Sequence, residues 1–270
     1  MDFTAILIIA ISIALYIYIK KTFKTLSIGS MSLITGGVKC GKSTLSVYLV
    51  MREYKARLRR WKFHQFIYKI TKFDKFNYEK PLLYSNVPLK CEYVPVTKDL
   101  LLRKKRFAYG SVIYLQESSL IADSMSYKAV NNDELLLFNK LIGHETQGGC
   151  LIYDTQSVSD NHFAVKRCIN NYFYIQKLVK WLPFFLVAYV RECRYSDDGS
   201  VVSVDTKDVG ETTKRVLIPR SIWKKFDCYC YSALTDYLPV VTQTIDNKKG
   251  ENMKAHFIVS FKEYKTNEKK

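Results

Sequence analysis

The sequence predicts an α/β fold in which helices flank a mostly parallel β-sheet, with a single transmembrane helix before it and a β-rich part after it. Three observations predict this arrangement. Short apolar runs alternate with helical patterns in the first two thirds of the chain, which is typical of parallel sheets. A glycine-rich segment separates the first such run from its helix. Beyond Asn170, β-branched and aromatic runs dominate.

The glycine-rich segment has the pattern Gly-x-x-x-x-Gly-Lys-Ser. An apolar run at Met31–Ile34 precedes it and a helical pattern at Ser43–Lys55 follows, so it forms a strand-to-helix turn. Backbone N–H groups at such a turn are unpaired and favour an anion. The pattern is that of the phosphate-binding P-loop, and we expect ATP and Mg²⁺ as cofactors. The predicted nucleotide-binding residues are Gly36, Gly37, Val38, Lys39, Cys40, Gly41, Lys42, Ser43 and Thr44.

Two of these residues have specific expected roles. Lys42 can reach the β- and γ-phosphates, and the Ser43 hydroxyl can hold Mg²⁺. A second apolar run, Ser111–Leu115, ends at Gln116-Glu117, where a P-loop ATPase carries its Walker B carboxylates. Gln116 replaces the usual Asp, and its amide cannot carry the charge. Glu117 remains as general base or metal-side carboxylate, so the departure weakens the case for fast hydrolysis but not for nucleotide binding.

A third buried strand is expected at Gly149–Gln156, and it ends in polar groups. If this strand lies beside the P-loop strand, Gln156 can contact a γ-phosphate or the attacking water. The segment before it, Asn131–Gly143, has one apolar helical face. His144 and His162 are isolated and are expected to be structural. The predicted metal ligands are therefore only Ser43 and Glu117.

The chain is strongly basic, with 42 Lys+Arg against 25 Asp+Glu and a net charge of +17. Such a charge favours nucleic acid or anionic lipid as a partner. Basic and aromatic residues interleave over Arg52–Tyr68, a composition that suits single-stranded DNA because charges track phosphates and rings stack on bases. A lipid headgroup layer suits it too. A solvated helix face with core aromatics is the third option.

The N-terminal region contains a continuous apolar run, Phe3–Ile19, followed by Lys20, Lys21 and Lys24. At about 1.5 Å per residue it can cross a thin bilayer. Asp2 precedes the run and lysines follow it, the reverse of a signal peptide. We expect a single-pass helix in the host inner membrane with the ATPase domain in the cytoplasm. A buried core helix is the alternative. The 7 scattered cysteines agree with a reducing compartment.

The expected domain organisation has four parts. Residues 1–27 are the anchor and its basic flank, 28–180 the P-loop core, 181–262 a β-rich extension that completes or packs on the core, and 263–270 a charged tail. Asp197–Gly199 predicts a hairpin turn between two strands of the extension. The apolar stretch Trp181–Tyr189 is too short, and too interrupted by proline, to span a bilayer; it predicts a buried strand or a peripheral patch.

Taken together, these features resemble the zonula occludens toxin (Zot) domain family, which includes morphogenesis ATPases of filamentous phages. The resemblance rests on GGVKCGKST at the P-loop, YSNVPL at Tyr84–Leu89, VIYLQES at the Walker B position, and the segment His144–Arg167. It covers about residues 31–195. It implies a P-loop fold of the additional-strand type, related to hexameric DNA translocases.

The same resemblance implies a membrane-associated ATPase that drives virion assembly, DNA export or genome packaging. Its implied partners are a homo-oligomeric ring, hexameric in the related translocases, together with DNA and other phage assembly proteins. Position by position, Lys42 and Glu117 would be catalytic, Gln156 a γ-phosphate sensor, and Arg167 a finger acting on a neighbouring subunit. The chain departs from the family at Gln116 and in its N-terminal anchor, since filamentous-phage members usually carry theirs after the ATPase domain.

Two other functions fit the sequence. A nucleotide-gated scaffold of a membrane assembly complex would bind ATP and scarcely hydrolyse it, because Gln116 lacks the Walker B charge. A general chromosome or plasmid translocase is the weaker option, because neither long motor extensions nor a DNA-reading winged helix is evident.

Overall fold

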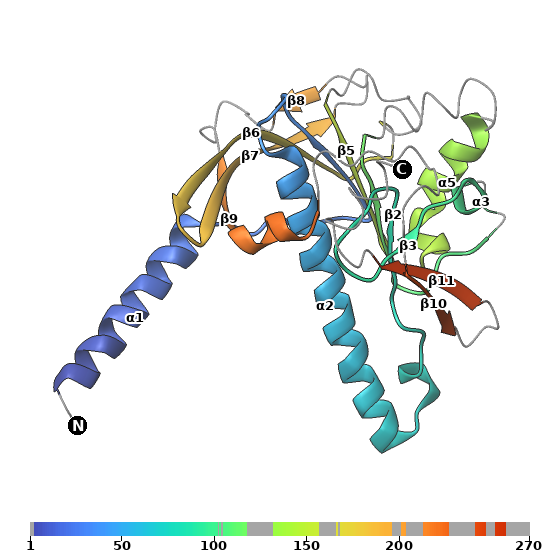
Figure 1. Cartoon of the computed structure of the whole chain (residues 1–270), viewed down its shortest axis with the longest axis horizontal. Helices are drawn as coiled ribbons and strands as arrows, with labels where there is room; N and C mark the ends of the chain where they lie inside the picture. The colour runs from blue at the N-terminus through green and yellow to red at the C-terminus, as the bar shows by residue number, and fades with distance from the viewer. Residues whose placement is uncertain are drawn as a thin grey trace.

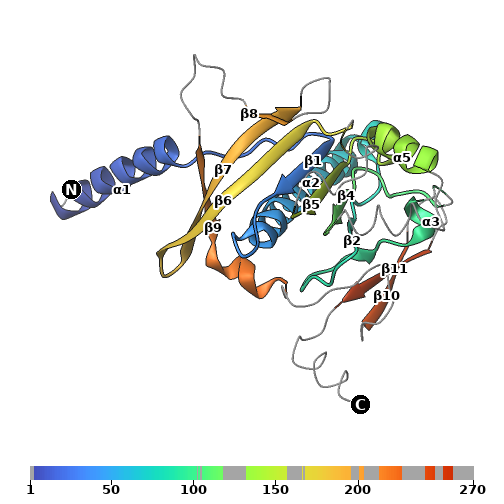
Figure 2. The same ribbon diagram turned by 90° about the horizontal axis from the view of Figure 1, so that it is seen from above.

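A computed structural model describes residues 3–101, 103, 105–117, 132–156, 166, 168–195, 201–203, 213–226, 241–246 and 252–257. It confirms an α/β fold built on a mostly parallel sheet (Figures 1 and 2). Six neighbouring strands run parallel in the spatial order β3-β2-β4-β5-β1-β6. Their bounds are β1 Met31–Thr35, β2 Leu83–Ser85, β3 Val94–Pro95, β4 Val112–Leu115, β5 Cys150–Thr155 and β6 Asn171–Leu182.

The second half of the chain continues this sheet in antiparallel fashion. Strand β7 (Phe185–Tyr195) pairs with β6, and both β8 (Val201–Ser203) and β9 (Lys214–Pro219) pair with β7. A separate antiparallel pair is formed by β10 (Val241–Asp246) and β11 (Asn252–Phe257).

The stretch predicted as a buried strand or a peripheral patch holds the end of β6, a turn and the start of β7, where Leu186 and Ala188 are buried. Phe184, at that turn, is 75% exposed. The turn expected at Asp197–Gly199 lies outside the described residues.

The helices cover both faces of the sheet. Leu45 and Leu49 of α2 (Lys42–Thr71) share a core cluster with Ile34 of β1, whereas Phe138 of α5 (Asn132–Glu145) packs in the other cluster. Since side chains alternate along a strand, α2 and α5 lie on opposite faces. The remaining short elements are α3 (Lys98–Leu101) and the 3-10 helices η1 (Asp74–Phe76) and η2 (Arg220–Lys224).

Helix α2 is much longer than the sequence pattern predicts. Its helical pattern was expected to end at Lys55, yet the helix spans 30 residues and ends at Thr71. The added part contains no glycine or proline and includes three Arg and two Lys, which form helices well. Figure 1 shows it projecting from the body. Phe63 and Phe66, expected in the core under the solvated-face option, are each 61% exposed, so that part of the option is wrong.

The N-terminal helix α1 (Phe3–Thr22) also projects from the body (Figure 1). It is long and apolar enough to cross a membrane, and none of its apolar window is buried in the protein. The alternative of a buried core helix is therefore wrong. After α1 the chain returns to the body, where the Lys24 N–H donates to the Arg215 carbonyl of β9 and Leu26 is buried.

We predict that Gly41→Ala lowers the free energy of unfolding by about 2 kcal/mol or more. Gly41 has φ +96°, and an added Cβ would lie 2.6 Å from the Leu178 side chain. Chemical denaturation of the detergent-solubilised full chain measures the change. Gly37→Ala is the matched control, because a Cβ there meets nothing within 4 Å, and its effect should stay within about 0.5 kcal/mol. Equal losses of stability in the two variants would contradict this role of Gly41.

Candidate nucleotide-binding site

The P-loop lies between β1 and α2, as the sequence predicts, and residues of β6 pack against it. A Cβ at Gly36 would lie 2.5 Å from the Ile175 side chain and 2.6 Å from the Cys40 sulfur. Gly41 forms the N-cap of α2 in the left-handed conformation. The loop can therefore follow this path only with glycine at both positions, which leaves backbone N–H groups at the helix N-terminus for an anion.

Lys42 lies between two carboxylates at this helix end. Its Nζ is 2.7 Å from Glu117 Oε1 and 3.8 Å from Asp154 Oδ1, and the residue is only 8% exposed. The structure thus brings together two of the predicted catalytic residues, Lys42 and Glu117, from parts of the chain 75 positions apart. Their contact holds the amine beside the loop that it is expected to serve.

The sheet order explains this convergence. Strand β5 lies between β1 and β4, and all three run parallel, so their carboxyl ends meet at one edge. Gln156 therefore follows a strand that lies beside the P-loop strand, which its predicted contact with the phosphate requires, and it is exposed there. The predicted finger Arg167 lies outside the described residues, as does His162.

Asp154 is the site residue that sequence reasoning missed. Its side chain is fully buried and accepts hydrogen bonds from the Tyr114 hydroxyl at 2.8 Å and the Glu117 backbone N–H at 3.1 Å. Burial raises the pKa of the Asp154 carboxyl, while the Lys42 charge and these hydrogen bonds act in the opposite direction. The signal in the sequence is an acidic residue inside an otherwise apolar strand, Leu-Ile-Tyr-Asp.

Asn86 fixes the backbone at the end of β4. Its side-chain amide donates to the Gln116 carbonyl at 2.9 Å, and its oxygen accepts from the Gln116 N–H at 2.8 Å. The next residue, Glu117, has φ +50°, which is uncommon for a residue with a side chain. Asn86, directly after β2, bonds the Gln116 backbone, and Asp154, in β5, bonds the Glu117 backbone. These hydrogen bonds hold the turn and so position the Glu117 carboxylate.

The donor set at this edge suits Mg²⁺. Ser43 offers a hydroxyl at the start of α2, and Glu117 and Asp154 offer carboxylates, all hard oxygen ligands. Within the described ranges no group of three or more His, Cys, Asp or Glu could hold a metal by itself. Mg²⁺ usually takes one or two carboxylates and completes its shell with water and phosphate. Thr44, by contrast, accepts a hydrogen bond from Trp223 Nε1 at 3.2 Å.

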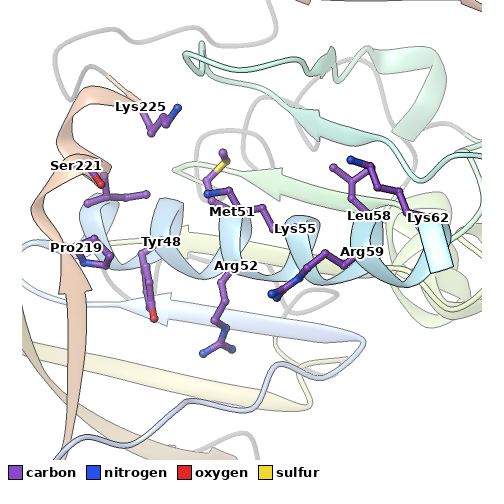
Figure 3. Close-up of a pocket in the computed structure, with 11 residues that line it drawn as sticks. Tyr48, Met51, Arg52, Lys55, Leu58, Arg59, Lys62, Pro219, Ser221 and Lys225 are labelled. Atoms are coloured by element: carbon purple, nitrogen blue, oxygen red, sulfur yellow. The ribbon is translucent and has the colours of Figure 1, made fainter. Parts of the chain in front are cut away.

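A second feature, which we call the basic groove, lies along α2 (Figure 3). Its volume is about 470 Å³, Met51 and Leu58 are among its lining residues, and the described residues that line it include no carboxylate. Five cations line it: Arg52, Lys55, Arg59, Lys62 and Lys225. Among the described residues, the Arg52 Nη1 atom is buried and has no hydrogen-bond partner. The groove is therefore suited to an anionic ligand.

Several solved structures are similar to this chain. The N-terminal domain of zonular occludens toxin from Neisseria meningitidis matches 74% of this chain and 100% of its own, with 12% identity and a TM-score of 0.43. The flagellar accessory protein FlaH from Methanocaldococcus jannaschii matches 72% of this chain and 88% of its own, with 16% identity and a TM-score of 0.35. The AAA domain of FIGL-1, in complex with ADP, matches 56% of this chain and 44% of its own, with 16% identity and a TM-score of 0.32.

The chain resembles the Zot N-terminal domain and other P-loop NTPases in structure. No protein-family model matches the chain, and no curated protein does. The likeness concerns the fold alone, so the roles of individual residues rest on the geometry described above.

We predict that Cys40 is alkylated by iodoacetamide more slowly than a free thiol near pH 7.5, and faster as the pH rises. Burial raises the pKa of the Cys40 thiol, so less of the reactive thiolate is present at neutral pH. Site-resolved mass spectrometry measures the rate. Bound Mg²⁺–ATP should slow it further at Cys40 but not at Cys168, a half-buried thiol whose pKa is also raised by burial. Equal rates with and without nucleotide at Cys40 would contradict the placement of the site.

Proposed function

We propose that this chain is a membrane-anchored P-loop ATPase that drives phage or virion assembly, DNA export or genome packaging. The observation that carries the proposal is the contact of Lys42 with Glu117 at 2.7 Å, at the edge where β1, β5 and β4 end beside the P-loop. A cation for the phosphates and a carboxylate for the attacking water stand together there, which is what phosphoryl transfer to water requires.

In this proposal the chain's own residues divide the chemistry between them. Lys42 leaves Glu117 and binds the β- and γ-phosphates, which also receive N–H groups of the P-loop. Glu117, released from that pair, orients the attacking water and accepts its proton. Gln156 contacts the γ-phosphate or the same water. Bound Mg²⁺, held from the Ser43 side, would neutralise charge on the phosphate oxygens.

The membrane and assembly roles rest on separate observations. The exposed apolar helix α1 supports a single-pass anchor, and Lys20 and Lys21 at its end support a cytoplasmic ATPase domain. The motif resemblance to the Zot family supports a role at the host inner membrane in a homo-oligomeric ring with other phage proteins. In such a ring Arg167 of one subunit would act on the nucleotide of its neighbour.

DNA is the proposed ligand of the basic groove. Its five cations without a lining carboxylate suit a phosphate backbone, and the apolar side chains between them suit the sugar and base surfaces of a single strand. Phe63 and Phe66 lie exposed further along the same helix and could stack on bases.

A nucleotide-gated scaffold is the second candidate function. Gln116 lacks the Walker B charge, and Lys42 is paired with Glu117. ATP would then change the position of Lys42 and the oligomeric state while turning over slowly.

We predict that the full chain in detergent or proteoliposomes hydrolyses ATP and that single-stranded DNA stimulates the rate. Glu117→Gln should lower the rate at least about a hundredfold while ATP still binds, because it removes the proton acceptor and keeps the shape. Lys42→Ala should abolish ATP binding. The rate is measured as phosphate release, and binding by calorimetry. Tight ATP binding with no turnover in either condition would favour the scaffold, and unchanged affinity in Lys42→Ala would contradict the site.

We also predict that the pair Lys55→Gln and Lys62→Gln weakens single-stranded DNA binding. The slope of log affinity against log salt should become shallower by about 0.7 for each phosphate that is no longer neutralised. The matched control is Arg60→Gln with Lys69→Gln, two cations of α2 that do not line the groove. Titrations at several salt concentrations measure both. Loss of binding to anionic vesicles, with DNA binding unchanged, would assign the groove to the membrane surface instead.

A further inference from the structure

The missing Walker B charge has a substitute on the neighbouring strand. We propose that Asp154, on β5, supplies the metal-side carboxylate that Gln116 cannot supply. This inference rests on the proposed function of the site as a Mg²⁺–ATP site. It separates two roles that the sequence assigns to Glu117 alone: Asp154 serves the metal, and Glu117 serves the water.

The strand register places Asp154 at the depth of the missing carboxylate. Leu115 pairs with Tyr153 in the parallel ladder of β4 and β5, so the next residue of each strand, Gln116 and Asp154, follows side by side. On its other side Asp154 pairs with Ile34 of β1, directly before the end of that strand. The carboxylate has thus moved one strand toward the P-loop, a shift of about 4.8 Å.

The side chain also lies on the face that the P-loop helix covers. Ile152, two residues before Asp154, and Ile34, its neighbour on β1, both belong to the core cluster that contains Leu45 and Leu49 of α2. Side chains two apart on a strand share a face, so Asp154 points to the α2 side. The 3.8 Å separation of Asp154 Oδ1 from Lys42 Nζ confirms this direction.

A change of cation explains why a fully buried carboxylate is placed here. An unpaired buried charge is strongly unfavourable, and Lys42 is the cation that lies near Asp154 among the described residues. When Lys42 moves to the phosphates, Asp154 requires another cation. A Mg²⁺ ion arriving with ATP meets this need, directly or through one of its waters.

The hydrogen bonds of Asp154 are compatible with a role as metal-side carboxylate. Its oxygens accept from the Tyr114 hydroxyl and from the Glu117 N–H, contacts that orient the carboxylate and hold the Glu117 turn. Such partners fix a metal-side carboxylate as outer-shell groups do in other metal sites. A role limited to positioning Glu117 would need these hydrogen bonds but not the charge, and this difference can be tested.

The test compares Asp154→Asn with the double variant Gln116→Asp/Asp154→Asn in the detergent-solubilised full chain. Asparagine keeps the shape but removes the charge: its oxygen can still accept from the Glu117 N–H, and its NH2 can donate to the Tyr114 hydroxyl oxygen. Mn²⁺ binding in the presence of a non-hydrolysable ATP analogue is followed by electron paramagnetic resonance, and analogue affinity in EDTA by calorimetry. We expect Asp154→Asn to lower Mn²⁺ affinity by about tenfold or more and to leave the affinity in EDTA within about twofold. The double variant should recover most of the Mn²⁺ affinity, because it returns a carboxylate to β4.

Tyr114→Phe is the structural control, since it removes a hydrogen bond to Asp154 and leaves the charge. It should lower stability, and it should lower Mn²⁺ affinity less than Asp154→Asn does, because the charge remains. Mn²⁺ affinity within about twofold of the native chain in Asp154→Asn would overturn the inference, as would loss of analogue affinity in EDTA to the same extent as in Mn²⁺. Absence of analogue binding by the native chain in either medium would instead reject the proposed ATP site itself.

Discussion

The buried position of Lys42 between Glu117 and Asp154 is the interaction on which the rest of the site depends. The lysine is brought there by the P-loop turn, whose path requires glycine at Gly36 and Gly41. The two carboxylates are brought there by strands β4 and β5, which end at the same edge. The cation compensates charges that burial would otherwise make costly. A ligand that binds Lys42 and draws it away must therefore leave both carboxylates with new partners. Ligand binding is in this way coupled to the positions of the residues at the ends of β4 and β5.

Two elements of the second half of the chain, β6 and η2, contact the P-loop and the start of α2. Ile175 and Leu178 of β6 pack against the P-loop glycines, and Trp223 of η2 donates a hydrogen bond to Thr44 at the start of α2. The predicted boundary at residue 180 falls inside β6, in the middle of one continuous sheet. Changes in the antiparallel strands can therefore reach the nucleotide through direct contacts, and α1 is joined to the same strands through Lys24 and Arg215.

The features that local sequence patterns determine were predicted from the sequence. The P-loop, the strands β1, β4 and β5, and the position of Glu117 at the end of β4 follow from motif spacing and from the alternation of strands with helices. The length of α2 was missed, because its exposed half follows helix propensity without an apolar periodicity to mark it. Asp154 was missed for another reason: its role depends on which strand stands beside β4, and only the sheet order reveals that. The role of Arg167 stays a prediction.

A structure of the full chain bound to Mg²⁺ and a non-hydrolysable ATP analogue would show directly whether the carboxylate pair releases Lys42 to the nucleotide. We expect the β- and γ-phosphates to lie on residues 36–44 and Lys42 Nζ to have left Glu117 for a phosphate oxygen. Glu117 should then face the γ-phosphate, with Asp154 on the metal side. An analogue bound elsewhere, or Lys42 still paired with Glu117 while the analogue occupies the loop, would contradict this exchange of partners.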